Sequence, residues 1–155
     1  LAEGREGDRD PDPPDALMDY RVFDHTADLG VEITAASREE LYAAAAYALF
    51  DLTADLSTVR AGIAREIAVS GEDEADLLVN FLREALYAWS GDGFLSKTCL
   101  VREATPRRLR AVLRGERFDP DRHRLKQEIK AVTYHQASVR ETEAGSWTAR
   151  VVFDV

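Results

Sequence analysis

The sequence predicts a single-domain α+β fold in which two helices pack on a largely antiparallel or mixed β-sheet. Two stretches in its first half repeat apolar residues at helical spacing, whereas the second half alternates apolar and polar residues over several short runs. Turn-forming residues separate these runs. The predicted order is strand, helix, strand, helix and then a series of strands, which is typical of helices that cover a sheet.

The first elements are predicted between residues 20 and 52. Two short strands, over 20–23 and 29–35, flank a polar connection of sequence Asp24-His25-Thr26-Ala27-Asp28. Ser37 begins the first helix, with Glu40 three residues later in the arrangement of a capping box. Apolar residues then follow at helical spacing, namely Leu41, Ala44, Ala45, Ala48, Leu49 and Leu52.

A third strand, over 63–69, and a second helix, capped by Asp73, follow. Gly91 and Gly93 end this helix, whose apolar face consists of Leu78, Phe81, Leu82, Ala85, Leu86 and Trp89. A period of two from Phe94 onward predicts the remaining strands over about 94–104, 107–115, 126–135 and 147–154, with a further short strand allowed over 136–141.

The composition is that of one compact domain, since 45% of the 155 residues are hydrophobic and 32% are charged. Residues 1–18 are acidic and rich in Pro and Gly, so we expect a disordered tail there and the folded domain over 19–155. Cys99 is the only cysteine, which excludes an internal disulfide and favours the reducing cytoplasm. No apolar run reaches the roughly 20 residues of a membrane span, so no membrane association is expected.

The net charge of −9 disfavours free nucleic acid as the main direct ligand, because the average field repels phosphates. An acidic surface suits a cation site or a basic protein partner, and solubility alone is the simplest explanation. Motifs of common enzymes are absent, including the GxSxG elbow, the Walker loop, HExxH and CxxC. Cys99 lies in a predicted strand with no evident base beside it, which favours a buried thiol.

Two segments with carboxylates are candidate parts of a cation site. Asp24, His25 and Asp28 fall within five positions of a loop that links two strands, although loop hydrogen bonds are the more frequent role of such residues. At the other end of the chain, an apolar strand places Asp154 beside Val155 and its terminal carboxylate. Oxygen groups of this kind suit Mg²⁺ or Ca²⁺. A solvated carboxylate at a strand end explains Asp154 equally well.

Lys130 is the third candidate. In a strand it shares a face with Val132 and Tyr134, and the apolar neighbours on both faces favour an interior strand. A lysine there needs a carboxylate partner or an exposed strand end. An ammonium that contacts carboxylates or phosphate explains its presence, and an exposed lysine is the simpler alternative.

Arginines form a fourth feature, because Arg108, Arg110 and Arg114 alternate with apolar residues and make one strand face basic. A solvated outer face is the simpler explanation, and a surface for RNA or a protein partner is the alternative.

Taken together, residues 20–155 resemble the archease family. The matching segments are modest alone but specific in their order and spacing: His25-Thr26-Ala27-Asp28, Glu128-Ile129-Lys130-Ala131-Val132-Thr133-Tyr134-His135, and Ala149-Arg150-Val151-Val152-Phe153-Asp154-Val155. The resemblance implies a non-catalytic activator of the GTP-dependent ligase that joins tRNA halves. Archeases promote guanylylation of this ligase and its multiple turnover.

The resemblance also implies particular site residues. A divalent cation, Ca²⁺ or Mg²⁺, would be held by Asp28, Asp154 and Val155, and Lys130 and His25 would act in ligase activation. The implied partner is the tRNA-splicing RNA ligase, through which tRNA is met indirectly.

Two other hypotheses remain open. The first is a metal-dependent phosphoesterase acting on RNA ends, with Asp24, His25, Asp28 and Asp154 as ligands and Lys130 as a phosphate clamp. It would turn over phosphoesters without a ligase. The second is a tRNA-binding module that uses the arginine-rich strand, which would bind tRNA alone with a strong dependence on salt.

Overall fold

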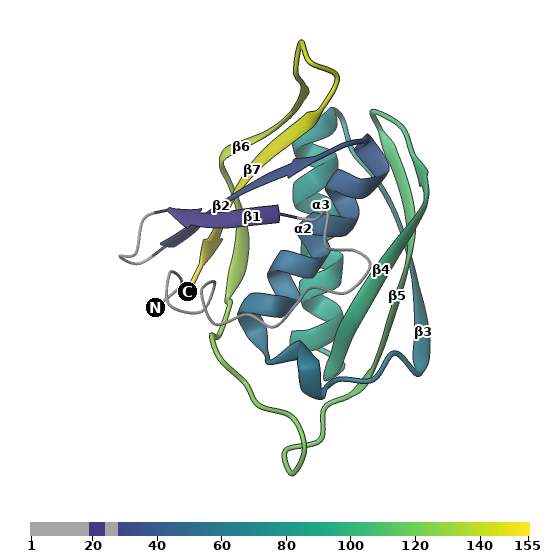
Figure 1. Ribbon diagram of the computed structural model, residues 1–155, viewed down its shortest axis with the longest axis vertical. Coiled ribbons are helices and arrows are strands. Elements are labelled where there is room, and N and C mark those ends of the chain that lie inside the picture. Colours follow the sequence, from purple (N-terminus) through teal and green to yellow (C-terminus); the bar gives the residue numbers. More distant parts are fainter. Residues whose placement is uncertain (1–18, 24–27) are drawn as a thin grey trace.

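Two antiparallel sheets enclose a layer of two helices in the computed structural model, which describes residues 19–23 and 28–155 (Figure 1). The first sheet has the strand order β1-β2-β7-β6 and the second the order β3-β5-β4. The elements are β1 (Asp19–Phe23), β2 (Asp28–Ala35), α2 (Arg38–Thr53), the 3₁₀ helix η1 (Leu56–Thr58), β3 (Ile63–Ser70), α3 (Glu74–Ser90), β4 (Phe94–Ala104), β5 (Arg108–Arg117), β6 (Ala131–Glu141) and β7 (Trp147–Asp154). The tail expected over residues 1–18 lies outside the described residues.

The α+β class and the two helices are confirmed, with the strands arranged in two sheets where the sequence predicted one. The physical reason lies in α2. Its buried residues include the consecutive Ala44, Ala45 and Ala46, so they occupy more than one face of the helix. A helix that is apolar around most of its circumference needs packing partners on both sides. Accordingly α2 packs against β2 on one side and β4 on the other.

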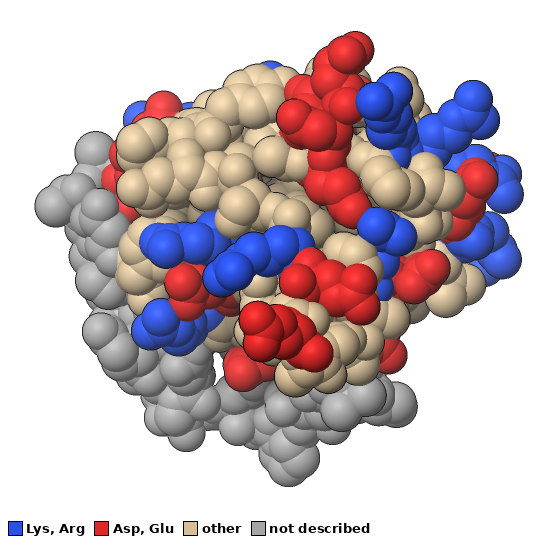
Figure 2. Space-filling view, turned by 90° about the horizontal axis from the view of Figure 1, so that it is seen from above, with Lys and Arg blue, Asp and Glu red and all other residues tan. Residues whose placement is uncertain are grey.

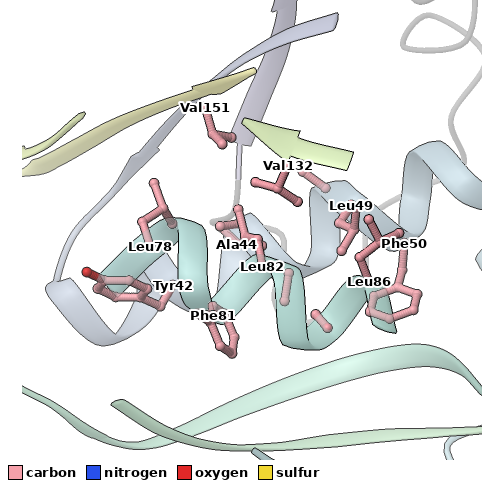
Figure 3. Close-up of a cluster of buried hydrophobic side chains, with 14 of the residues drawn as sticks. Tyr42, Ala44, Leu49, Phe50, Leu78, Phe81, Leu82, Leu86, Val132 and Val151 are labelled. Atoms are coloured by element: carbon pink, nitrogen blue, oxygen red, sulfur yellow. The ribbon is translucent and has the colours of Figure 1, made fainter. Parts of the chain in front are cut away.

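The apolar core fills the space between the helices and the sheets (Figure 3). Phe81 and Leu82 of α3 and Leu49 of α2 are fully or almost fully buried. Val132 and Val151 close the core from the first sheet. Each such side chain contributes about 1.5–3 kcal/mol to folding relative to an exposed one.

Both predicted helix caps are present. The side chain of Ser37 accepts a hydrogen bond of 3.1 Å from the Glu40 amide, and that of Asp73 accepts one of 2.9 Å from the Asp76 amide. These caps satisfy amides that have no partner within the helix. Local chemistry therefore determines where each helix begins.

The segment before β6 differs from the prediction. A strand was predicted over 126–135, whereas β6 begins at Ala131 and runs to Glu141 with a register shift between Thr133 and Ser138. Gln136 has φ +59°, which interrupts the regular alternation of faces. The interior position inferred for this strand is also wrong, because β6 is an edge strand of its sheet. Its apolar residues are covered by α3 rather than by another strand.

A second irregularity lies between β4 and β5, where the register shifts between Ser96 and Thr98. Gly115 lies opposite Ser96. A Cβ atom at Gly115 would overlap the carbonyl oxygen of Leu95 and lie 2.8 Å from the Cα of Ser96. The two backbones therefore approach so closely that only glycine fits.

Glu116 holds the loop between β5 and β6 against the second sheet. Its carboxylate accepts hydrogen bonds of 2.9 and 2.6 Å from the Arg122 guanidinium and of 2.8 Å from the Arg60 amide. His123, whose side chain is fully buried, lies 2.8 Å from the same carboxylate through Nε2. Nδ1 of His123 accepts a hydrogen bond from the Asp119 amide, so the N–H group of the ring is at Nε2, which donates a hydrogen bond to Glu116.

This arrangement predicts a defined pH dependence of stability. The Arg122 guanidinium, together with the other donors, holds the pKa of Glu116 well below its usual range. A lowered pKa in the folded state stabilises the fold above the unfolded pKa of about 4.3, and that stability is lost as the pH falls through the folded value. Glu116→Gln should therefore be less stable than the parent at pH 7, and the difference should shrink below about pH 4. Urea unfolding from pH 7 to pH 3 measures this, and a difference independent of pH would contradict it.

Candidate functional site

Asp28 and Asp154 lie directly opposite each other at one end of the first sheet, as the first residue of β2 and the last of β7. Side chains of opposed residues in an antiparallel pair project from the same face with Cβ atoms about 5 Å apart. Residues that alternate with this pair, such as Val151 and Phe153, point into the core. The two carboxylates are therefore neighbours on the outer face of the sheet.

The same face shows how an acidic residue is normally neutralised. Glu32 lies four residues from Asp28 in β2, opposite Arg150. It forms ion pairs of 2.7 Å with Arg21 and 3.6 Å with Arg150. Within the part of the chain that the structure describes, neither Asp28 nor Asp154 has such a partner. Like charges placed directly opposite each other in a sheet are destabilising, so this end of the sheet favours binding of a cation.

A backbone hydrogen bond places Lys130 beside Asp154. Its amide donates a hydrogen bond of 2.7 Å to the carbonyl oxygen of Asp154, and the next residue, Ala131, is the register partner of Asp154. The side chain of Lys130 is exposed. The structure thus brings together three of the residues singled out in the sequence.

Phe23 fixes the strand that precedes the 24–27 connection. It pairs with Gly30, and its ring occupies the space that a Cβ at Gly30 would need. The guanidinium of Arg150 lies 4.4 Å from the centre of the same ring. The cation–π contact with Arg150 and the close approach to Gly30 hold the ring against the sheet.

Two of the predicted site residues, Asp24 and His25, lie outside the described residues. Val155 follows β7 directly, is half-buried and packs against the core. Among residues 19–23 and 28–155, no group of three or more His, Cys, Asp and Glu side chains meets in a cluster. The two aspartates of the described part would therefore need further oxygen ligands to complete a cation shell.

Side-chain contacts between β6 and α3, which the sequence did not predict, fix the segment after Lys130. The hydroxyl of Tyr134 donates a hydrogen bond of 2.7 Å to Asp76, and the guanidinium of Arg83 lies 4.6 Å from the Tyr134 ring centre. Nε of Arg83 donates to the carbonyl oxygen of Val132 at 3.1 Å. Part of the unpaired edge of β6 is thereby satisfied from the helix. Neither Asp76 nor Arg83 belongs to a recognisable motif.

A buried carboxylate, that of Asp51 in α2, also escaped prediction. The Tyr20 hydroxyl donates a hydrogen bond to it, and Nζ of Lys126 lies 3.8 Å away. Only its place on the otherwise apolar helix could have marked it in the sequence. These contacts connect α2 with β1 and with the loop before β6.

Cys99 is half-buried, and desolvation raises the pKa of its thiol to about 12. It therefore stays protonated at neutral pH and is unsuited to nucleophilic catalysis. The residue is less buried than the sequence predicted.

The described part of the site lies outside two hollows of the surface. Asp28, Asp154 and Lys130 line neither the hollow of about 570 Å³ between α3 and residues 125–129 nor the one of about 300 Å³ beside Arg65. Sites for small molecules are usually concave. Neither helix in the described part of the chain is long and apolar enough to cross a membrane.

Comparison with known proteins gives concordant results. The model of the Archease protein family (MTH1598/TM1083) matches residues 20–155. Protein archease of Pyrococcus abyssi is 38% identical over 139 residues, which cover 88% of this chain and 98% of the relative. Protein archease of Methanopyrus kandleri is 40% identical over 141 residues, with coverage of 89% and 100%.

Solved structures share the fold. The solution structure of Methanobacterium thermoautotrophicum protein 1598 superposes with a TM-score of 0.73 at 28% identity, covering 88% of this chain and 98% of that one. The crystal structure of TM1083 from Thermotoga maritima, described as an archease and possible chaperone, has a TM-score of 0.62 at 23% identity, with coverage of 86% and 94%.

Proposed function

Because this chain belongs to the archease family, we propose that it activates a GTP-dependent tRNA-splicing RNA ligase in the cytoplasm by promoting guanylylation and multiple turnover of that enzyme. The observation that carries the proposal is the opposed pair of Asp28 and Asp154 beside Lys130, the residues that the resemblance implies. They lie on an open sheet end, which suits contact with a macromolecular partner better than enclosure of a small substrate.

The cation proposed for this site fits the residues present. Asp28 and Asp154 offer the hard oxygen ligands that Ca²⁺ and Mg²⁺ require. In the described part of the chain, neither carboxylate is neutralised by a basic side chain. The α-carboxylate of Val155 is the third proposed ligand, and water would complete the shell. A bound cation would supply positive charge to the two opposed carboxylates.

The residues of the chain itself have distinct proposed roles. The two aspartates would bind the cation, and the extended backbone of β2 and β7 orients their side chains toward the same face of the sheet. Lys130, whose backbone amide hydrogen-bonds to Asp154 and whose side chain is exposed, would bind a phosphate or a carboxylate of the ligase complex through its ammonium group. His25 is the second residue proposed to act in activation.

Multiple-turnover ligation tests the proposal. RNA halves with a 2′,3′-cyclic phosphate or 3′-phosphate end, GTP and substoichiometric cognate ligase are incubated with and without this protein. Turnover beyond one product per ligase only in its presence supports activation. Cleavage of phosphoesters by the protein alone with Mg²⁺ or Mn²⁺ would instead support the phosphoesterase hypothesis.

Lys130→Ala should reduce this activation by about 10- to 150-fold, the equivalent of a charge-assisted hydrogen bond of about 1.5–3 kcal/mol. The side chain is exposed, so the melting temperature should change little. Lys130→Arg keeps the charge and should recover part of the activity. Strong destabilisation with normal activity per folded molecule would assign Lys130 a structural role instead.

A further inference from the structure

The outer face of the second sheet has a charge opposite to that of the protein as a whole. Arg108, Arg110 and Arg114 project from the same face of β5, at positions that alternate with the buried Leu109, Ala111 and Leu113. All three arginines are exposed. The helices cover only the inner side of this sheet, and in the described part of the chain no element covers the outer side (Figure 1).

Of these three arginines, Arg108 and Arg114 are the more open, although the exposed Glu66 of β3 lies on the same face, opposite Val112. On β3 the opposed residues are small: Ser70 faces Arg108, Ala68 faces Arg110 and Ala64 faces Arg114. On β4, Thr98 faces Arg114. Glu103 forms an ion pair with Arg110, at 3.3 Å. In the described part of the chain, neither Arg108 nor Arg114 has a carboxylate partner.

The acidic excess of the chain does not cancel this local charge. Interactions between exposed charges are largely screened beyond about 8 Å at physiological ionic strength. A layer of helices separates the outer face of β5 from the first sheet, and a helix with its side chains is about 10 Å across. In the view from above, Lys and Arg gather at the right-hand side, on which the second sheet lies, with few acids between them (Figure 2).

We propose that the outer face of β3, β5 and β4 binds the phosphodiester backbone of single-stranded RNA. Guanidinium groups bind phosphate in a bidentate manner, and a row of them along one strand matches a polymer of phosphates. A protein interface would need an apolar centre. In the described part of the chain this face offers one exposed large apolar side chain, Leu100 of β4, opposite the buried Val112. None of the opposed residues on β3 and β4 is aromatic, so the contacts would be made to phosphates and not to bases. Because phosphate contacts carry no sequence information, the binding should not depend on base sequence.

The choice of RNA over DNA rests on the proposed function, whereas phosphate binding rests on the arginines alone. The protein would then hold RNA through one sheet while the acidic pair and Lys130 on the other sheet remain free for the ligase. This differs from indirect contact with tRNA through the enzyme.

The test measures fluorescence anisotropy of a labelled single-stranded RNA with the protein alone, between 50 and 200 mM salt. Neutralisation of three phosphates predicts a slope of about −2 in log K against log salt, a loss of about 20-fold over this range. In Arg108→Gln/Arg114→Gln the slope should fall to about −0.7, a loss of about threefold. The matched control, Arg124→Gln/Arg140→Gln, makes the same change in net charge at exposed positions elsewhere and should behave like the parent.

Equal binding by both double variants, or no binding of RNA at 50 mM salt, overturns the proposal. If single-stranded DNA of the same length binds with the same affinity as the RNA, the phosphate-binding surface stands but its assignment to RNA is refuted. The ligation assay distinguishes the two proposals. If the protein activates the ligase but does not bind RNA on its own, the proposed RNA-binding surface is refuted and the proposed function stands. If the protein binds RNA but does not activate the ligase, the proposed function is refuted and the RNA-binding surface stands.

Discussion

Asp28→Asn and Asp154→Asn should each lower the affinity for Ca²⁺ and Mg²⁺ by about 100-fold or more, since loss of even an outer-shell partner typically costs 10- to 100-fold. Each should also abolish activation of the ligase. The two residues are opposed in the register of β2 and β7, so removal of either charge leaves a single aspartate for a divalent ion. Calorimetric titration and multiple-turnover ligation measure the two effects.

Each of these two substitutions should raise stability in the cation-free protein and lower it, relative to the parent, when the cation is present. Without cation, either substitution removes a like-charge pair and should raise stability by about 0.2–1 kcal/mol. With cation, the parent alone gains stability, by about 2.7 kcal/mol at a concentration of 100 Kd. Thermal melts with and without Ca²⁺ separate these contributions. A variant destabilised equally in both conditions would indicate a structural role for the pair.

Glu32→Gln is the matched control, because it removes a carboxylate from the same face that is already neutralised by Arg21 and Arg150. Its cation affinity should stay near that of the parent. A Gly-Ser extension after Val155 tests the third ligand, since it moves the terminal carboxylate away. Unchanged affinity in the extended protein would exclude Val155, and unchanged affinity in Asp28→Asn as well would refute the shared site.

Gly115→Ala should destabilise the fold by about 3 kcal/mol or more, the upper range for overpacking. The added Cβ would overlap the backbone of Leu95, and a backbone atom cannot rotate away as a side chain can. Relief would require β4 to separate from β5, the central strand of its sheet. Urea unfolding monitored by tryptophan fluorescence gives the change in free energy of unfolding.

Gly62→Ala serves as its control. Nothing lies within 4 Å of a Cβ placed at Gly62, and alanine there restricts the unfolded chain. Its stability should therefore equal or exceed that of the parent by up to about 1 kcal/mol. Similar stabilities of the two variants would show that β4 and β5 tolerate a wider separation.

Features encoded by adjacent residues were predictable from the sequence. The caps at Ser37 and Asp73 depend on a side chain and an amide three residues later, so the helices were placed correctly. The register shift within β6 was not predictable, because it accompanies the left-handed conformation of Gln136. The contact of Arg83 in α3 with the carbonyl oxygen of Val132, near the start of β6, likewise has no local signal. The presence of two sheets depends on burial around nearly all of α2, which the search for one apolar face overlooked.

The site shows the same division. The residue types near Asp28 and Asp154 indicated oxygen ligands, but nothing local indicated that the two segments meet. Only the pairing of β2 with β7 brings them together, and the sequence contains no short-range signal for it. The resemblance to archeases was therefore needed to combine them in one proposed site.

The strand order has a consequence for synthesis on the ribosome. β2 is made before its partner β7, which follows all the other described strands, so one edge of β2 stays unpaired until β7 has emerged. The second sheet contains β3, β4 and β5, which are contiguous in the chain apart from α3, and can form earlier. Nascent chains would thus complete the face with the arginines before the acidic pair exists, and the pair would mark a chain that has been translated through β7.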